Sequence, residues 1–385
     1  MLPGIYIHIP FCKQACFYCN FHFSTTQDLK NKMIGAICKE IDLRKISERE
    51  DISIIGSNEK IETIYFGGGT PSLLSEEEIG CILSAIDKNY SRAEEVEITF
   101  EANPDDINID SLMRWKQAGI NRLSIGIQSF VERDLVWMNR VHDVQQALNC
   151  IRLAIDVGFH NYSIDLIFGI PGLTNEEWIE NVQTAIDLNV PHIACYALTV
   201  EPKTALHKMI ALKKKENINN DVQAVQYAIL MKMMKEAGYE HYEISNFAKP
   251  GFRSQHNSSY WQGKKYIGIG PSAHSYDGKN RMWNIANNPL YINSINEGTI
   301  PFEEENLTAS QMLNEYVMVS IRTIEGINLK YITDRFSLKE RNRIEKSVEV
   351  EMKEQNVSRN GEQVCLTDKG KLIADALTVR LFSEM

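Results

Sequence analysis

Apolar runs of strand length alternate with helix-like stretches through the first two thirds of the chain. Strands are expected at 4–9, 62–66, 96–100, 122–127, 162–168 and 192–198. Helices are expected at 29–46, from 75 onward, and at 110–117, 144–157, 175–188 and 222–237. A repeated strand–helix order predicts a parallel sheet with right-handed crossovers. Because about six such units fit before residue 245, we expect an α/β fold built as an open, partial (β/α)6 barrel.

The pattern changes after residue 245. Residues 246–300 are rich in Asn, Gly, Ser and aromatic residues and have weak helical periodicity. Helical periodicity resumes near residue 310, and 368–382 reads as a terminal helix. We therefore predict a core at 1–245, a connecting segment at 246–300 and a smaller, mostly helical C-terminal domain at 301–385.

Composition and charge narrow the class of protein. The chain has 385 residues, of which 43% are hydrophobic and 24% charged, as is typical of a globular protein with a substantial core. The net charge of −10 argues against a nucleic-acid partner. No apolar run reaches the roughly 20 residues of a membrane span, and the N-terminus lacks a signal-peptide pattern. We expect a cytoplasmic protein; peripheral membrane association and a homodimer are left open.

Three of the eight cysteines lie close together after the first strand. Cys12, Cys16 and Cys19 have the spacing Cys-x3-Cys-x2-Cys. Three thiolates can bind three irons of a [4Fe–4S] cluster and leave the fourth iron open for a ligand. A Cys3His zinc site that includes His22 is the alternative, because the same spacings occur in zinc sites. The five scattered cysteines have no assigned role.

Polar and glycine residues follow several expected strands. The run Gly67 to Thr70 follows the second strand, Glu101 the third and Gln128 the fourth, and Asp165 lies within the fifth. The carboxyl ends of parallel strands are where α/β folds bind ligands. Glycines there let backbone N–H groups approach a ligand, although a tight turn alone would also explain them. The pattern indicates a nucleotide-like ligand at this edge.

Together these motifs resemble the radical-SAM superfamily, named for S-adenosylmethionine (SAM). The Cys-x3-Cys-x2-Cys triplet follows a strand and has an aromatic residue, Tyr18, before its last cysteine. The sequence YIHIPFC at 6–12 resembles one branch, the oxygen-independent coproporphyrinogen III oxidases and their heme-chaperone relatives of the HemW type. The run LTDKG at 366–370 is also similar to this group, so the resemblance spans nearly the whole chain.

The resemblance implies a [4Fe–4S] cluster on the three cysteines and SAM beside it. Gly67 to Thr70 is similar to the motif that binds the methionine amino group, and Gln128 and Asp165 to a pair that binds the ribose hydroxyls. Arg140 matches an arginine that pairs with the SAM carboxylate, and Glu101 matches the acid of a Glu-x-Asn-Pro motif. The implied SAM-site residues are Tyr6, Tyr18, Gly68, Gly69, Thr70, Glu101, Gln128, Arg140 and Asp165.

Two features distinguish the branches. The oxidases resemble Cys-x3-Cys-x2-Cys-x-Cys, and here Phe21 stands at the fourth position. The oxidases also carry a segment ahead of the first strand, whereas here the expected strand begins at Gly4. Both departures favour the chaperone branch.

Residues 256–261 read HNSSYW and match the HNxxYW motif of HemW-type heme chaperones. Imidazole is a good iron ligand, which makes His256 the candidate heme ligand. Tyr260 and Trp261 offer flat apolar faces to a porphyrin. Nearby cations that could meet the heme propionates are Arg253, Lys264 and Lys265. A polar loop capped by a core tryptophan is the alternative interpretation.

The function expected from these features is that of a heme chaperone on a radical-SAM scaffold. It would bind heme and deliver it to a heme-requiring apoprotein. The alternative is an oxygen-independent coproporphyrinogen III oxidase, in which radical-SAM chemistry decarboxylates propionates oxidatively. A zinc-stabilised protein without radical chemistry is a third, weaker hypothesis.

Overall fold

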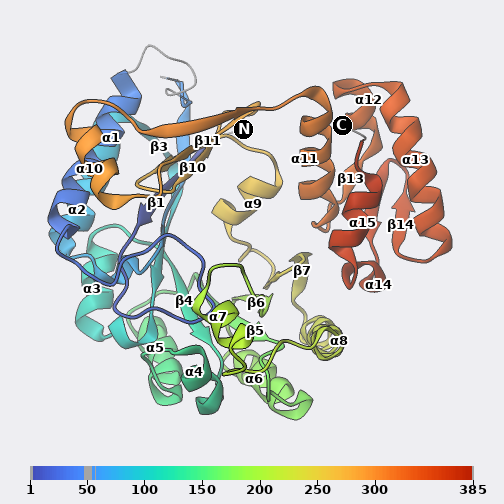
Figure 1. Ribbon diagram of the computed structural model, residues 1–385, viewed down its shortest axis with the longest axis horizontal. Coiled ribbons are helices and arrows are strands. Elements are labelled where there is room, and N and C mark those ends of the chain that lie inside the picture. The colour runs from blue at the N-terminus through green and yellow to red at the C-terminus, as the bar shows by residue number, and fades with distance from the viewer. Residues whose placement is uncertain (1–2, 47–53, 57, 384–385) are drawn as a thin grey trace.

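The computed structural model describes residues 3–46, 54–56 and 58–383. A long twisted sheet runs through most of the molecule, helices cover its outer side, and a second unit lies at the C-terminal end (Figure 1). Among the described residues, no helix is long and apolar enough to cross a membrane.

The centre of the sheet is the expected parallel array. Neighbouring strands pair in sequence order and in parallel. The strands are β1 (Gly4–Ile9), β2 (Lys60–Gly68), β3 (Ser91–Ala102), β4 (Arg122–Gln128), β5 (Tyr162–Phe168) and β6 (His192–Ala197). Within the described part of the chain β6 pairs with β5 and β8 but not with β1, so the barrel is open. The prediction of a partial (β/α)6 barrel is confirmed.

Helices fill the crossovers between these strands and bury apolar faces against the sheet. They are α1 (Lys30–Ile46), α2 (Glu76–Asn89), α3 (Ile109–Gln117), α4 (Glu132–Met138), α5 (Val144–Asp156), α6 (Asn175–Asp187), α7 (Ala205–Ala211) and α8 (Asn220–Glu236). Ser75, the expected helix start, caps α2: its side chain accepts a hydrogen bond from Glu78 N–H, and Glu78 binds back to the backbone of Ser75. The sequence did not predict α4 and α7, which are only seven residues long and show little periodicity.

Residues 246–300, expected as a connecting segment, extend both edges of the barrel sheet. On the β6 side, β8 (Asn246–Ala248) and β7 (Glu240–Glu243) pair antiparallel. On the β1 side, β9 (Tyr266–Ile269) pairs in parallel, followed by β10 (His274–Tyr276) and β11 (Asn280–Asn284). The same segment contains helices α9 (Gln255–Trp261) and α10 (Asn288–Asn296). Strands of three to five residues carry almost no detectable alternation.

A buried ionic network holds the β9 edge in place. The Glu40 carboxylate on α1 lies 2.8 Å from an Nη atom of Arg44 and is fully buried. It also accepts hydrogen bonds from the Gly270 backbone N–H at 2.8 Å and the Tyr291 hydroxyl at 2.6 Å. The amide of Asn284 donates to it at 2.8 Å. A buried charge needs this many partners, and the network ties α1 to β11 and α10.

The C-terminal unit has a core of its own. Strand β12 (Phe302–Asn306) still belongs to the main sheet, and the second apolar core begins at Leu313 and ends at Leu381. Its helices are α11 (Ala309–Ile321), α12 (Leu329–Arg335), α13 (Leu338–Lys353), α14 (Asp368–Lys371) and α15 (Ala374–Leu381). A small sheet of β13 (Ile327–Asn328), β15 (Gln363–Leu366) and β14 (Val357–Asn360) completes it. Helices predominate, as predicted.

The two units are joined by polar contacts as well as by the chain. The Ile244 N–H donates to the Arg322 carbonyl at 3.1 Å, and the Ile324 N–H donates to the Tyr242 carbonyl at 3.0 Å. The Arg253 guanidinium is 2.8 Å from Glu325. These contacts place α11 opposite α9, and the space between the units becomes part of the site described below.

Candidate functional site

The cysteine loop, residues 10–24, begins at the end of β1 and closes back on it. The Cys12 N–H donates to the Ser24 carbonyl at 3.0 Å, and the Ser24 N–H donates to the Pro10 carbonyl at 2.9 Å. These two bonds close the base of the loop and hold its three cysteines at the carboxyl end of the parallel sheet. The loop is therefore where ligands bind in this class of fold.

The segment after α4 supports the cysteine loop from the other side. Asn139 adopts a left-handed conformation with φ of 63°, and its amide donates to the Ala15 carbonyl at 2.8 Å. The next residue, Arg140, donates from Nη1 to the Cys16 sulfur at 3.4 Å. Its Nη2 donates to Asn103 Oδ1 at 2.7 Å. A guanidinium at this position can donate a hydrogen bond to a cysteine sulfur that binds metal.

The three cysteines are half-buried, and their thiols interact electrostatically. Burial raises the pKa of Cys19 to about 11, the Phe21 backbone N–H opposes that rise, and the neighbouring Cys16 and Cys12 add to it. Burial also raises the pKa of Cys12. Thiols of this kind bind a cluster with loss of their protons.

The zinc alternative requires His22 to join the thiols. Instead, Nε2 of His22 lies 2.7 Å from Oδ1 of Asn288. Across the described parts of the chain, no three His, Cys, Asp or Glu side chains converge closely enough to bind a single metal ion.

The glycine run after β2 passes directly under the cysteine loop. The Gly69 N–H donates to the Ile9 carbonyl at 2.9 Å, and the Thr70 N–H donates to the Phe11 carbonyl at 2.7 Å. Gly68 has φ of 106°, and a Cβ there would lie 2.5 Å from the His8 ring. Only glycine fits this close approach without strain.

Two carboxylates stand at the same edge of the sheet. Glu101 accepts a hydrogen bond from the Tyr65 hydroxyl at 2.7 Å and one from the Gly68 N–H at 3.2 Å. Burial raises the pKa of Glu101 to about 7; the bond from Tyr65 opposes this rise, and nearby Asp165 adds to it. Burial likewise raises the pKa of Asp165 to about 7, although Arg140 and Arg122 oppose the rise.

Asp165 is half-buried and forms no hydrogen bond with any residue that the structure describes. A carboxylate without donors can accept hydrogen bonds from a ligand that carries hydroxyl or ammonium groups. Gln128 ends β4 in a left-handed conformation with φ of 70° and is buried at the same edge. The structure thus brings together the glycine run, Glu101, Gln128 and Asp165, and it places Arg140 between this group and the cysteines.

Sequence reasoning missed two members of this group. Asn103 donates to the Thr70 hydroxyl at 3.3 Å and accepts from Arg140, so it links the glycine run to the cysteine support. Tyr65 holds the Glu101 carboxylate. Asn103 is the asparagine of the Glu-x-Asn-Pro motif that begins at Glu101, and that motif was the available signal. Nothing in the sequence distinguishes Tyr65 from a core tyrosine.

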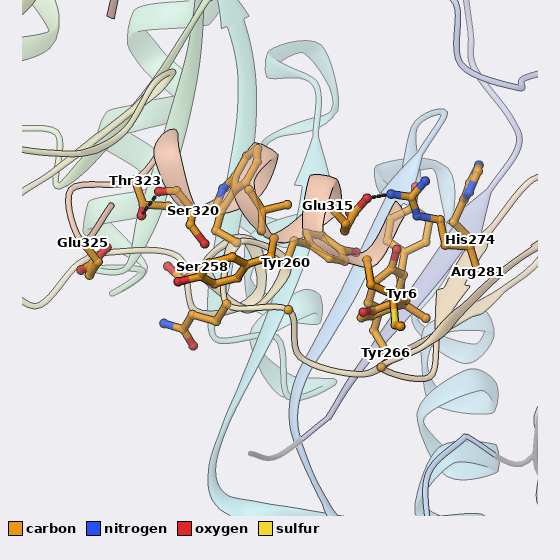
Figure 2. A pocket seen from close by; sticks show the side chains of 18 of the residues that line it. Tyr6, Ser258, Tyr260, Tyr266, His274, Arg281, Glu315, Ser320, Thr323 and Glu325 are labelled. Carbon is orange, nitrogen blue, oxygen red and sulfur yellow. Dashed lines mark hydrogen bonds and ion pairs between the residues drawn. The ribbon is translucent and has the colours of Figure 1, made fainter. Parts of the chain in front are cut away.

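Beside this site, a cavity of about 1010 Å³ lies between the barrel and the C-terminal unit (Figure 2). Its volume is at the upper end of the roughly 300–1,000 Å³ of small-molecule sites. Tyr6, Asn20 and Phe21 line it on the cluster side, and α11 contributes Glu315 and Tyr316 on the other. Further aromatic residues in the wall are Tyr242, Tyr260, Trp261, Tyr266, Tyr276, Tyr331 and Phe336.

The HNxxYW segment is helix α9, and its residues face two different environments. Tyr260 and Trp261 line the cavity, as a porphyrin contact would require. His256 is 1% exposed and is stacked on Tyr65, with ring centroids 4.9 Å apart. Its Nδ1 lies 2.7 Å from Oγ1 of Thr63, and its Nε2 lies 2.9 Å from the Tyr260 hydroxyl. Binding of iron by His256 would require breaking one of these bonds.

Of the three cations expected to meet the heme propionates, one lines the cavity and two do not. Arg253 lines the cavity and bonds to Glu240 and Glu325. Lys264 pairs with Glu62 at 2.7 Å and Lys265 with Glu59 at 3.9 Å, and neither lysine lines the cavity. Phe21, at the position of the oxidases' fourth cysteine, is 66% exposed and forms part of the cavity wall.

Residues 6–185 match the family model of the radical SAM superfamily. The structure is similar to coproporphyrinogen III oxidase (HemN) from Escherichia coli, with a TM-score of 0.83 at 20% identity, covering 100% of this chain and 91% of that one. The fold and the sequence match define a radical-SAM protein. Such proteins use a [4Fe–4S] cluster and SAM.

Curated relatives narrow the class further. A heme chaperone HemW from Bacillus subtilis is 33% identical over 100% of both chains. One from Mycobacterium tuberculosis is 32% identical over 97% of this chain and 93% of the relative, and one from Escherichia coli is 36% identical over 70% and 69%. The chain belongs to the HemW family, which confirms the resemblance read from its motifs.

Proposed function

We propose that this protein binds heme in the cavity between its two units and delivers it to a heme-requiring apoprotein. The observation that carries the proposal is the aromatic cavity of about 1010 Å³, into which the Tyr260 and Trp261 side chains of the HNxxYW helix project. A porphyrin is flat and largely apolar, and aromatic side chains bury such faces well. The relatives named heme chaperones support this assignment of ligand.

The cluster and SAM sites are proposed from the same geometry. Cys12, Cys16 and Cys19 would hold three irons of a [4Fe–4S] cluster. When bound, the cluster would supply the electron that cleaves SAM. The residues proposed to hold SAM are Tyr6, Tyr18, Gly68, Gly69, Thr70, Glu101, Gln128, Arg140 and Asp165. Tyr6 belongs to the wall of the heme cavity as well, so the two sites adjoin.

Replacement of Asp165 by alanine is expected to weaken SAM binding by one to two orders of magnitude. The reason is loss of one charge-assisted partner of the ribose hydroxyls, worth about 1.5–3 kcal/mol. Calorimetry on the cluster-loaded protein measures the affinity, and Asp156→Ala, an exposed position on α5, is the control. Equal SAM affinity in Asp165→Ala and the unaltered protein would show that the pocket lies elsewhere. Arg140→Ala tests the SAM site less directly, because Arg140 also contacts the cysteine loop at Cys16.

The alternative function is oxidative decarboxylation of a porphyrinogen. The shared wall at Tyr6 favours it, because a substrate in the cavity would lie beside SAM. Phe21 argues against it, because a phenyl group stands at the position where the oxidases have a fourth cysteine.

Titration of the cluster-loaded protein with hemin tests the proposed heme binding. We expect one heme per chain, and the absence of a saturable spectral change would contradict the proposal.

A further inference from the structure

Three histidines line the cavity at the end that adjoins the cysteine loop, namely His8, His22 and His274. His8 is 4% exposed; its Nδ1 lies 3.1 Å from the Tyr6 hydroxyl, and its Nε2 lies 2.8 Å from the His22 carbonyl. Nε2 of His22 contacts Asn288. His8, like His256, therefore has both ring nitrogens engaged, and His22 has one engaged.

His274 differs from the others. It lies on β10, is exposed, and forms no hydrogen bond with any residue in the described part of the chain. Its ring lies 6.0 Å from that of Trp283, the residue it faces on β11. Partial desolvation at the cavity wall and the guanidinium of Arg281 lower its pKa, which favours the neutral imidazole that binds metals. Figure 2 shows His274 beside Arg281 in the cavity wall.

We propose that His274, and not His256, is the protein ligand of the heme iron. The inference rests on the proposed heme-binding function and specifies the ligand at that site. One bond forms, from a ring nitrogen lone pair to iron, and no proton or electron is exchanged. His256 is then a positioning residue that holds α9 against β2 through Thr63 and Tyr65, so that Tyr260 and Trp261 face the porphyrin.

The cations that line the cavity are consistent with a heme whose iron is bound by His274. Arg281 is paired with Glu315, and Arg253 is paired with Glu240 and Glu325. Arg335 also lines the cavity, and no described residue forms an ion pair with it. The positive charge of Arg335 interacts electrostatically with the Tyr276 hydroxyl, two residues beyond His274 on β10. Because a guanidinium binds a carboxylate well, Arg335 is the candidate partner for a heme propionate.

The test is hemin titration of the cluster-loaded His274→Ala variant, followed by absorption and electron paramagnetic resonance spectra. We expect a changed Soret band and a heme affinity lower by at least roughly tenfold, since even an outer partner of a metal ligand contributes that much. Added imidazole should restore the original spectrum by occupying the vacated iron position. His160→Ala, at an exposed histidine without contacts in the described structure, is the control.

Failure of this inference can be told apart from failure of the proposed function. If the unaltered protein does not bind hemin, the heme-carrier function itself is wrong. If it binds hemin and His274→Ala leaves spectrum and affinity unchanged, the function stands and His274 is not the ligand. His256→Asn is expected to lower the heme affinity while keeping the position of the Soret band, as loss of a positioning residue would; a shifted Soret band that added imidazole restores would assign the iron to His256.

Discussion

Replacing Cys12, Cys16 or Cys19 by alanine is expected to abolish assembly of the iron–sulfur cluster. Anaerobic reconstitution of the unaltered chain should give about four irons and four sulfides per chain, and each variant close to none. The effect should be large because each thiol would be one of three protein ligands. The loop that carries them is closed at its base by the Cys12–Ser24 and Ser24–Pro10 bonds. Iron and sulfide analysis measures it.

The control for this experiment is Cys365→Ala. Cys365 lies in the C-terminal unit, half-buried, on β15. It should leave iron and sulfide at the level of the unaltered protein. An intact cluster after loss of any of the three loop thiols, or stoichiometric zinc without sulfide in the unaltered protein, would contradict the assignment.

Filling the cavity is expected to abolish heme binding while leaving the cluster in place. Ser258 projects from α9 into the cavity, and no hydrogen bond of its hydroxyl is found in the described structure (Figure 2). Ser258→Trp places an indole where the porphyrin would lie. Val319→Trp does the same from α11, on the opposite wall. Both variants should show no saturable Soret change in a hemin titration, because the blocked volume cannot be recovered without moving the two units apart.

Ser84→Trp is the matched control, since Ser84 is exposed on α2. It should bind hemin as the unaltered protein does. Iron and sulfide content should be the same in all of these variants, because the cysteine loop is closed by its own backbone bonds. If both cavity variants bind hemin normally, the heme lies outside the cavity.

The barrel could be predicted because its elements carry strong local signals. Each of its six parallel strands contains an apolar run close to the one expected, and Ser75 began its helix through a capping box. Parallel pairing then brings the strand ends to one edge, which is why Glu101, Gln128 and Asp165 could be grouped with the glycine run without coordinates. Asn103 and Tyr65 complete that group through contacts between strands.

The cavity could not be predicted, because its walls come from segments far apart in the sequence. Phe21 belongs to the cysteine loop, Tyr266 to β9 and Tyr316 to α11. The short strands β9 to β12, which place these walls, have too few residues for a periodic pattern. Two residues of the motif at 256–261, Tyr260 and Trp261, line the cavity, but motif spacing says nothing about the direction in which each side chain faces.

His256 shows this limit most clearly. On α9 it lies four residues before Tyr260, so both project on one side of the helix, and Nε2 of the histidine meets the tyrosine hydroxyl. The imidazole reaches into the barrel to Thr63, however, whereas the phenol ring borders the cavity. Burial, with a contribution from Arg122, lowers the pKa of His256 to about 3. These are properties of the packed interior, which no single-sequence pattern encodes.

One preparation distinguishes heme carriage from porphyrinogen oxidation. Cluster-loaded protein with SAM and a reductant is divided between a hemin titration and an assay with coproporphyrinogen III. We expect saturable binding of one heme per chain and no detectable protoporphyrinogen IX. Conversion of coproporphyrinogen III to protoporphyrinogen IX, with no saturable heme binding, would contradict this expectation.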